Sequence, residues 1–329
     1  MRISSIIEVV EGELKNSPSI SFVYKIKTHI NKVHEGDLFI AKNEEDIPIA
    51  IKKGAFGIIY DFEIDIIDKE IAWIQVANIN YAISKLIRFK LSNQDLKAFY
   101  CNKITFELLT LFVKYNDEKI KLISNNLDDE IELMESIENF DTIICQDKEI
   151  LNNIYPNNKN FNHTQYAVKN LVEHSLFETT FSCGKNYFSR LKLPSLYINH
   201  FLEVYAFLNN EVDTNRLKKL RSFKPLFIDK YFKMIEYGNS DKFILSQIDE
   251  SIAVFEINHL KNKYKYAKTY IFSKKTSKID KSMVDYFVNT LHDMKELLVN
   301  IKFNAIYVVG FSQEEIEHFI TKNNTKSLL

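Results

Sequence analysis

The sequence predicts an α/β protein of more than one domain, built on parallel sheets. A chain of 329 residues can bury more than one hydrophobic core. Residues 32–61 read as strand, helix and strand, and the right-handed crossover rule makes such a unit a parallel pair with its helix on one face. Within residues 223–329, short strands alternate with long helices, which is typical of a parallel α/β sheet.

The strand-helix-strand unit is the best-specified stretch of the chain. Residues 34–37 (HEGD) are a turn signal, and the apolar run 38–41 after them predicts a short buried strand. Residues 47–53 have apolar side chains at helical spacing, and Gly54 stands where a helix end favours a residue with positive φ. The second strand is expected at 56–60.

The other elements follow from periodicity and end signals. Helices are expected at 4–11 (capped by Ser4 or Ser5), 79–89 (opened by Asn78 or Asn80), 104–115, 128–138, 197–208, 212–220, 249–263, 281–300 and 313–321. Strands are expected at 71–76, 96–100, 120–124, 142–145, 166–170, 243–248, 270–273 and 305–309, with a β-rich run at 20–30, a hairpin-like pair at 175–192 and a loop at 152–162.

Composition excludes several classes of function. A net charge of −1 provides no basic field, so we expect no nucleic-acid partner. No apolar run is long enough for a signal peptide or a membrane span, which predicts a cytoplasmic protein. The three cysteines, Cys101, Cys145 and Cys183, are widely spaced and indicate neither a disulfide framework nor a zinc site. The histidines are scattered, and no metal site is expected.

The first 90 or so residues carry a family resemblance. The pattern Val-x-x-Gly-Asp-Leu-Phe-Ile-Ala followed by a helix ending Lys-Gly-Ala resembles the N-terminal domain of the Mur ligases, and within them the UDP-N-acetylmuramoyl-tripeptide:D-alanyl-D-alanine ligases. The matching residues are Val33, Gly36, Asp37, Leu38, Phe39, Ile40, Ala41, Asp46, Ile47, Ala50, Lys53, Gly54 and Ala55. The resemblance implies three α/β domains, at 1–92, 93–222 and 223–329.

In that family the first domain binds the uridine nucleotide of the peptidoglycan precursor. The family's Asp-Ser-Arg falls on His29-Ile30-Asn31, and the loop before the helix is shortened to residues 42–45. If a uridine nucleotide is bound, the resemblance places its contacts at two segments, with Lys42 as the diphosphate partner. The candidate residues are Thr28, His29, Asn31, Lys42 and Asp46.

The central domain of the family carries a Gly-x-x-Gly-Lys-Thr phosphate loop. Aligned on Lys103, its glycines fall on Phe99 and Asn102 and its threonine on Ile104. A phenylalanine blocks close backbone approach, and an isoleucine has no oxygen for Mg²⁺. With only seven glycines in the chain, no glycine-rich loop replaces it. A vestigial ATP site is therefore expected at Asn102, Lys103 and Thr105.

The family's later motifs are altered as well. Leu193 and Pro194 match its Leu-Pro-Gly-x-His-Asn, but Tyr197 replaces the histidine and Ile198 the asparagine. We therefore expect a catalytically degenerate homologue, without catalytic residues or cofactors. It would act as a binding or regulatory protein linked to peptidoglycan precursor synthesis. Its partner would be a UDP-sugar precursor or a cell-wall enzyme. Two alternatives stay open: an active ATP-dependent amide ligase that uses ATP and Mg²⁺, and a nucleotide-sugar-binding module.

Overall fold

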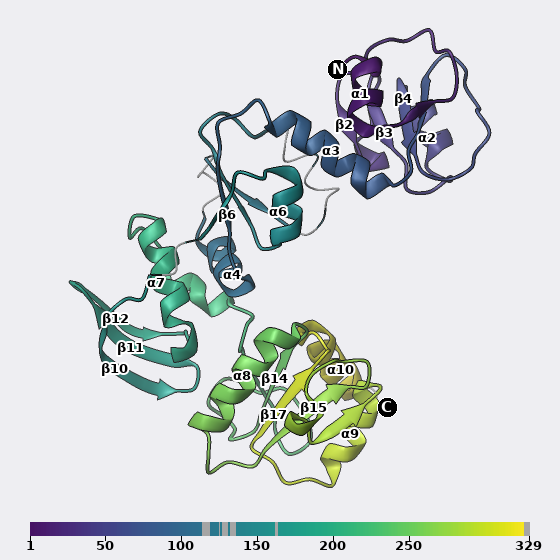
Figure 1. Cartoon of the computed structure of the whole chain (residues 1–329). Coiled ribbons are helices and arrows are strands. Elements are labelled where there is room, and N and C mark those ends of the chain that lie inside the picture. The colour runs from purple at the N-terminus through teal and green to yellow at the C-terminus, as the bar shows by residue number, and fades with distance from the viewer. Residues whose placement is uncertain (114–118, 125, 127–130, 132–135, 162–163, 326–329) are drawn as a thin grey trace. The chain divides into compact units, whose positions relative to one another are not determined.

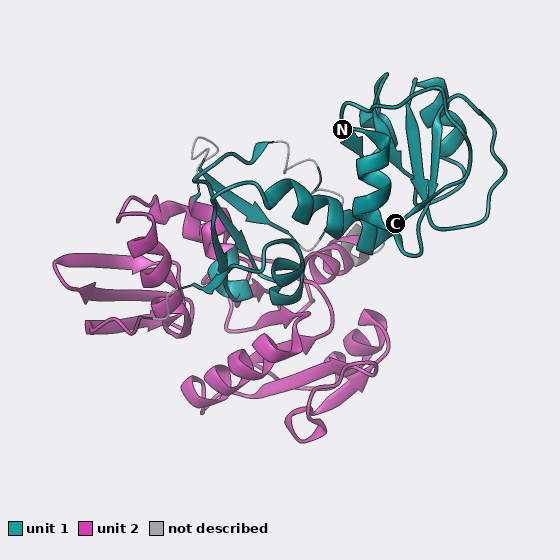
Figure 2. Cartoon of the chain, turned by 45° about the horizontal axis from the view of Figure 1, so that its top comes forward, with its two compact units in different colours: residues 1–106, 113–163 teal, residues 107–112, 164–329 magenta. Residues whose placement is uncertain are grey.

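The computed structural model of the protein describes residues 1–113, 119–124, 126, 131, 136–161 and 164–325, and confirms the α/β fold. Figure 1 labels its helices and strands. The chain forms two compact units, one of residues 1–106 and 113–163 and the other of residues 107–112 and 164–329 (Figure 2). The finer division at 92 and 222 stays a prediction.

The first unit begins with a five-stranded sheet in the order β1-β5-β4-β3-β2. Its strands are β1 (Glu13–Leu14), β2 (Ile26–Lys27), β3 (Leu38–Ile40), β4 (Gly57–Tyr60) and β5 (Ala72–Gln75). Strands β2 to β5 pair in parallel, and β1 joins β5 antiparallel. The helices are α1 (Ile3–Val10), η1 (Ile30–Lys32), α2 (Ile47–Lys52) and α3 (Ile79–Leu91). The predicted β3-α2-β4 unit is confirmed.

A second sheet in the same unit has the order β7-β8-β6-β9. It consists of β6 (Lys97–Tyr100), β7 (Ile120–Ile123), β8 (Thr142–Cys145) and β9 (Lys159–Asn160), all parallel, with α4 (Lys103–Phe112) and α6 (Lys148–Ile154). One apolar cluster joins both sheets through α3, where Leu86 and Leu91 are buried with Ile74 of the first sheet and Ile143 of the second.

The second unit begins with a three-stranded antiparallel sheet, β10 (Val168–Ser175), β11 (Glu178–Cys183) and β12 (Asn186–Leu191). Helical segments η3 (Ser195–Tyr197), α7 (Ile198–Phe207) and η4 (Thr214–Lys219) follow. The hairpin predicted around Gly184, which has φ of 59°, is confirmed.

The last sheet has the order β13-β14-β17-β15-β16. It contains β13 (Leu226–Phe227), β14 (Phe243–Gln247), β15 (Thr269–Lys274), β16 (Tyr286–Val288) and β17 (Ala305–Val309), with α8 (Glu250–Lys263), η5 (Lys281–Met283), α9 (Leu291–Val299) and α10 (Gln313–Thr325). Met294 of α9 and Ile316 of α10 pack with Ile306 and Val308 on one face. Because side chains alternate along β17, Tyr307 points to the other face, toward α8.

Several elements differ from the prediction. The single helix expected at 281–300 is wrong, because β16 within it pairs in parallel with β15. The loop expected at 152–162 is partly wrong, because α6 enters it after Asp147 caps the helix, accepting from the amides of Glu149 and Ile150. Helix α1 has Arg2 rather than a serine at its N-cap. The one named strand within residues 20–30 is β2, and in place of the helix expected at 212–220 the structure has the 3₁₀ segment η4 at Thr214–Lys219.

The remaining predictions concern length and position. The strand expected at 166–170 is the start of β10, which runs to Ser175 as the edge of the antiparallel sheet. The acidic helix expected at 128–138 falls mostly on residues outside those the structure describes. None of the described helices is long and apolar enough to cross a membrane.

Candidate functional site

Two of the predicted ligand segments lie at one edge of the first sheet. Strand β2 ends at Lys27 and β3 ends at Ile40, and the two strands are parallel neighbours in the register Ile26 to Leu38. Residues 28–31 and 42–46 therefore leave the sheet at its carboxyl edge, where ligands bind in open α/β sheets. Thr28, His29 and Asp46 are half-buried, while Asn31 and Lys42 are exposed.

Hydrogen bonds hold both segments. The Nζ atom of Lys53, at the end of α2, donates to the carbonyl of Ile30 over 2.8 Å. In the other loop, Asn43 Nδ2 donates to Asp46 Oδ2 and the Asp46 amide donates to Asn43 Oδ1, both at 3.0 Å. The loop is thus closed on itself, and Lys42 stands beside it with its charge at the surface.

The turn before β3 uses its motif residues as the sequence suggests. Gly36 has φ of +89°, and its amide donates to the carbonyl of Gly54 over 2.9 Å. Asp37 is 3% exposed, and its carboxylate accepts from the amide of His34 over 3.0 Å. These contacts orient β3 and its neighbours; they do not reach the ligand segments.

The second predicted site lies where β6 leads into α4. Strand β6 ends at Tyr100 and α4 begins at Lys103, so two residues join them. The Oδ1 atom of Asn102 accepts from the amide of Thr105 over 2.9 Å, and Thr105 is 1% exposed. The structure brings Asn102, Lys103 and Thr105 together as one helix start.

The Phe99 ring, on β6, packs edge-on against Phe161 with ring centroids 6.1 Å apart. Phe161 is 2% exposed and lies just after β9. Aromatic packing therefore occupies the space next to the helix start.

A buried carboxylate occupies the second unit. Glu256 of α8 is fully buried, and its carboxylate accepts hydrogen bonds from the hydroxyls of Tyr197 and Tyr307. Burial raises the pKa of Glu256 to about 7, although hydrogen bonds to these tyrosines lower it. Burial and the neighbouring Glu256 raise the pKa of both tyrosines well above the ordinary value.

This cluster links two parts of the second unit. Tyr197 ends η3, while Tyr307 lies on β17 of the last sheet. In the sequence, the spacing Glu256-x-x-His259 is at most half of a metal motif and does not indicate a buried acid. A better signal was available, because Ala253, Glu256, Ile257 and Leu260 share the apolar stripe of α8. A glutamate at such a position needs buried partners.

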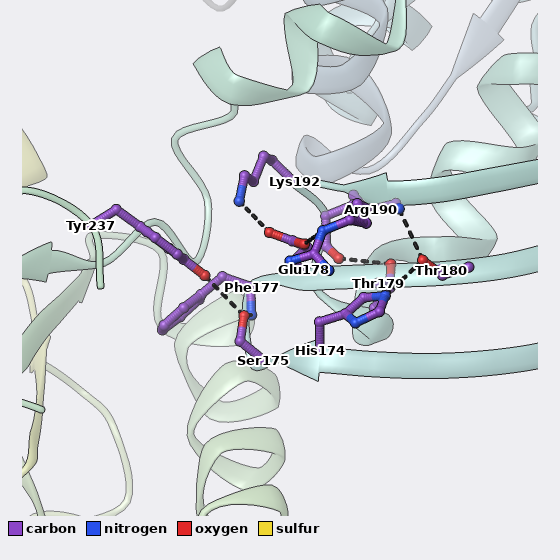
Figure 3. A network of polar contacts seen from close by, with 10 residues as sticks. His174, Ser175, Phe177, Glu178, Thr179, Thr180, Arg190, Lys192 and Tyr237 are labelled. Atoms are coloured by element: carbon purple, nitrogen blue, oxygen red, sulfur yellow. Dashed lines mark hydrogen bonds and ion pairs between the residues drawn. The ribbon is translucent and has the colours of Figure 1, made fainter. Parts of the chain in front are cut away.

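A polar network lies at the end of the antiparallel sheet where β10 ends and β11 begins (Figure 3). Glu178 is 4% exposed; Arg190 Nε lies 2.8 Å from its Oε1, and Lys192 pairs with its Oε2. Although burial raises the pKa of Glu178, the cations outweigh it and lower the pKa below the ordinary value. The Lys192 ammonium also stands 4.6 Å over the Tyr237 ring, whose hydroxyl is 2.9 Å from Ser175 Oγ.

In the part of the chain that the structure describes, no three His, Cys, Asp or Glu side chains gather in a way that could hold a metal ion. Among the described residues no cysteine forms a disulfide, and Cys101 and Cys145 are buried.

Comparison with solved structures identifies the fold as Mur-ligase-like. No protein-family model and no curated protein matches the sequence. Among solved structures, the chain is similar to a UDP-N-acetylmuramoylalanyl-D-glutamyl-2,6-diaminopimelate-D-alanyl-D-alanyl ligase from Acinetobacter baumannii, with a TM-score of 0.53, 11% identity and coverage of 99% of this chain and 98% of that one.

Two MurF structures are similar to the chain as well. A second structure from Acinetobacter baumannii has a TM-score of 0.57 at 11% identity, with the same coverage. MurF from Thermotoga maritima in complex with ADP has a TM-score of 0.53 at 14% identity and covers 92% of this chain and 99% of that one. At such identities the likeness shows the fold, so the predicted Mur-ligase-like architecture is confirmed.

Proposed function

We propose that this protein uses a Mur-ligase fold to bind rather than to ligate, as a binding or regulatory protein near the cytoplasmic steps of peptidoglycan precursor synthesis. The observation that carries the proposal is the two-residue connection between β6 and α4. Its partner would be a UDP-sugar precursor or another cell-wall enzyme.

Ligation by this fold needs an acyl phosphate, and therefore a cradled γ-phosphate with its metal ion. A phosphate cradle is a glycine-rich loop whose amides point at the anion. Here the connection is short, and the Asn102 side chain already accepts from the Thr105 amide. The Thr105 hydroxyl is buried, and Ile104 beside it has no oxygen for a metal. Lys103, the first residue of α4, supplies positive charge at the helix start.

Two rival functions have specific support. An active ATP-dependent amide ligase is favoured by similarity along nearly the whole chain to MurF, one structure of which holds ADP. A nucleotide-sugar-binding module is favoured by residues 28–31 and 42–46 at one carboxyl edge of the first sheet. This second role is compatible with the loss of ATP chemistry.

Calorimetry with Mg-ATP tests the proposal, with the Thermotoga maritima MurF as positive control. We expect a dissociation constant weaker than about 1 mM for this protein. Phosphate release should also stay at background when UDP-N-acetylmuramoyl-tripeptide and D-alanyl-D-alanine are added. Micromolar ATP binding that disappears in Lys103→Ala would establish a rebuilt phosphate site and overturn the proposal.

A further inference from the structure

One segment of the chain departs sharply from its balanced overall charge. Residues 214–235 hold seven of the 43 lysines and arginines and a single acidic residue, Asp229. They form η4, β13 and the start of the β13–β14 connection in the second unit. Aromatic and other apolar residues lie between the cations, so the segment combines positive charge with hydrophobic surface.

This segment lines most of a cavity of about 380 Å³. Most of its lining is apolar: the walls include Phe177, Leu217, Leu220, Phe223, Leu226 and Met234. Three lysines, Lys192, Lys218 and Lys224, line it too, against one acid, Glu317. Ligand pockets of a few hundred cubic ångströms with apolar walls and a few convergent polar groups are the usual form of small-molecule sites.

The three lysines differ in whether an acidic side chain already pairs with them. Lys192 is paired with Glu178 and stands over the Tyr237 ring. Lys218 and Lys224 are exposed, and neither has an ion-pair partner in the described part of the chain. The carboxylate of Glu317 accepts a hydrogen bond from Gln313 Nε2 over 3.2 Å and forms no ion pair with Lys218 or Lys224. The cavity therefore has uncompensated positive charge beside an apolar interior.

The rim also leaves hydrophobic surface uncovered. Met234 is 42% exposed and Tyr237 is 49% exposed, and both line the cavity. The Tyr237 ring packs edge-on against the Phe227 ring, with their centroids 5.1 Å apart. A ligand chain lying here would remove both apolar surfaces from water.

We propose that this cavity binds an anionic amphiphile, with its apolar chain against the Leu217 to Leu226 wall and its carboxylate or phosphate head at Lys218 and Lys224. An anion without an apolar chain would leave the apolar lining uncovered, and an apolar chain with a neutral head would not pair with the two ammonium groups. The inference rests on the binding role proposed above and names a ligand class for it. The site lies wholly within the second unit.

Calorimetry at low salt with ten-carbon chains below their micellar concentrations tests the site. Decanoate tests a carboxylate head on the apolar chain, and decyl phosphate tests a phosphate head. Acetate and inorganic phosphate carry the same head groups without the chain. Decyl maltoside and decyltrimethylammonium supply the chain with a neutral or positive head. We expect saturable one-to-one binding of decanoate, decyl phosphate or both, and none of the other four.

A double variant, Lys218→Glu with Lys224→Glu, should weaken this binding by about tenfold or more, because two attractions become repulsions. The matched control is Lys219→Glu with Lys265→Glu, which changes the net charge equally at exposed positions outside the cavity lining. It should bind as the natural protein does. Far-UV circular dichroism of both variants checks that they fold.

Three results would overturn the inference: equal binding of neutral or cationic ten-carbon chains, equal loss in the two double variants, or no binding of either anionic chain. Binding only to phosphatidylglycerol vesicles, with none to single amphiphiles, would also overturn it in favour of a membrane surface. ATP is absent from these solutions, so failure here leaves the proposal about the β6–α4 connection standing, and the reverse holds too.

Discussion

The buried Glu256 should make the stability of the second unit fall as pH rises. In the unfolded chain this carboxyl titrates near 4.5, whereas burial raises its pKa to about 7 in the folded protein. The folded state thus binds the proton more tightly, and stability is greatest below the unfolded pKa. It is lost as pH rises from about 4.5 to about 7 and is constant above.

The difference between the two pKa values gives the size of the effect. Each pKa unit corresponds to about 1.4 kcal/mol, so the charged carboxylate lowers the free energy of unfolding by about 3 kcal/mol at pH 8 relative to pH 4. Glu107 adds repulsion, while hydrogen bonds from the two tyrosines and from Gln247 oppose the rise. A loss of this size is a large part of the stability of an ordinary domain.

The assay compares the natural protein with Glu256→Gln, which keeps the size and carries no charge. Urea unfolding is followed by far-UV circular dichroism between pH 4.5 and pH 8.5. We expect the stability of the variant relative to the natural protein to rise by about 3 kcal/mol over this range. The fluorescence of Trp73, the only tryptophan, reports the first unit and serves as an internal control.

The half-buried His259 changes stability with pH in the opposite direction. Burial lowers the pKa of His259, so its own contribution to stability grows as pH rises. It is present in both proteins and cancels in their difference. Parallel stability curves for the natural protein and Glu256→Gln would refute the reasoning, because Glu256 would then titrate alike when folded and unfolded.

Three further predictions concern the first unit. Gly36→Val should destabilise it by about 1 kcal/mol or more, since φ is +89° and an added Cβ would lie 2.1 Å from the Tyr24 ring; an unchanged melting temperature would contradict this. Asn102→Ala should cost about 1 kcal/mol by removing the cap on the Thr105 amide, measured by thermal melting, with Asn102→Asp as the control that retains it. If the uridine site is retained, NMR shifts with UDP-N-acetylmuramic acid should lie in residues 28–31 and 42–46 and vanish in Lys42→Ala; no shifts at millimolar ligand would count against that site.

Local signals in the sequence determined much of the architecture. Strand β3, helix α2 and strand β4 follow from an apolar run, helical spacing and Gly54, whose φ of +86° matches the prediction. Asn78 caps α3 as expected, accepting from the Tyr81 amide over 2.9 Å. These features depend on neighbours within a few residues, so the sequence contains the whole cause.

The residues at the start of α4 were also predicted from the sequence. Asn102 stands before that helix and Phe99 on the strand that leads to it, and the structure adds the two-residue connection and the contact with Phe161. That Asn102 turns its oxygen to the Thr105 amide follows from its position before a helix. The conformation of this helix start is thus determined largely by residues close to it in the sequence.

Contacts between distant segments were decided by the tertiary structure alone. Strand β16 forms because β15 offers it a parallel partner, which no helical pattern in residues 281–300 reveals. The partners of Glu256 lie 59 and 51 residues away along the chain, and the apolar residues that line the cavity beside Lys218 range from Phe177 to Tyr237. Burial depends on what packs against a side chain, so the raised pKa and the charged cavity exist only once the chain has folded.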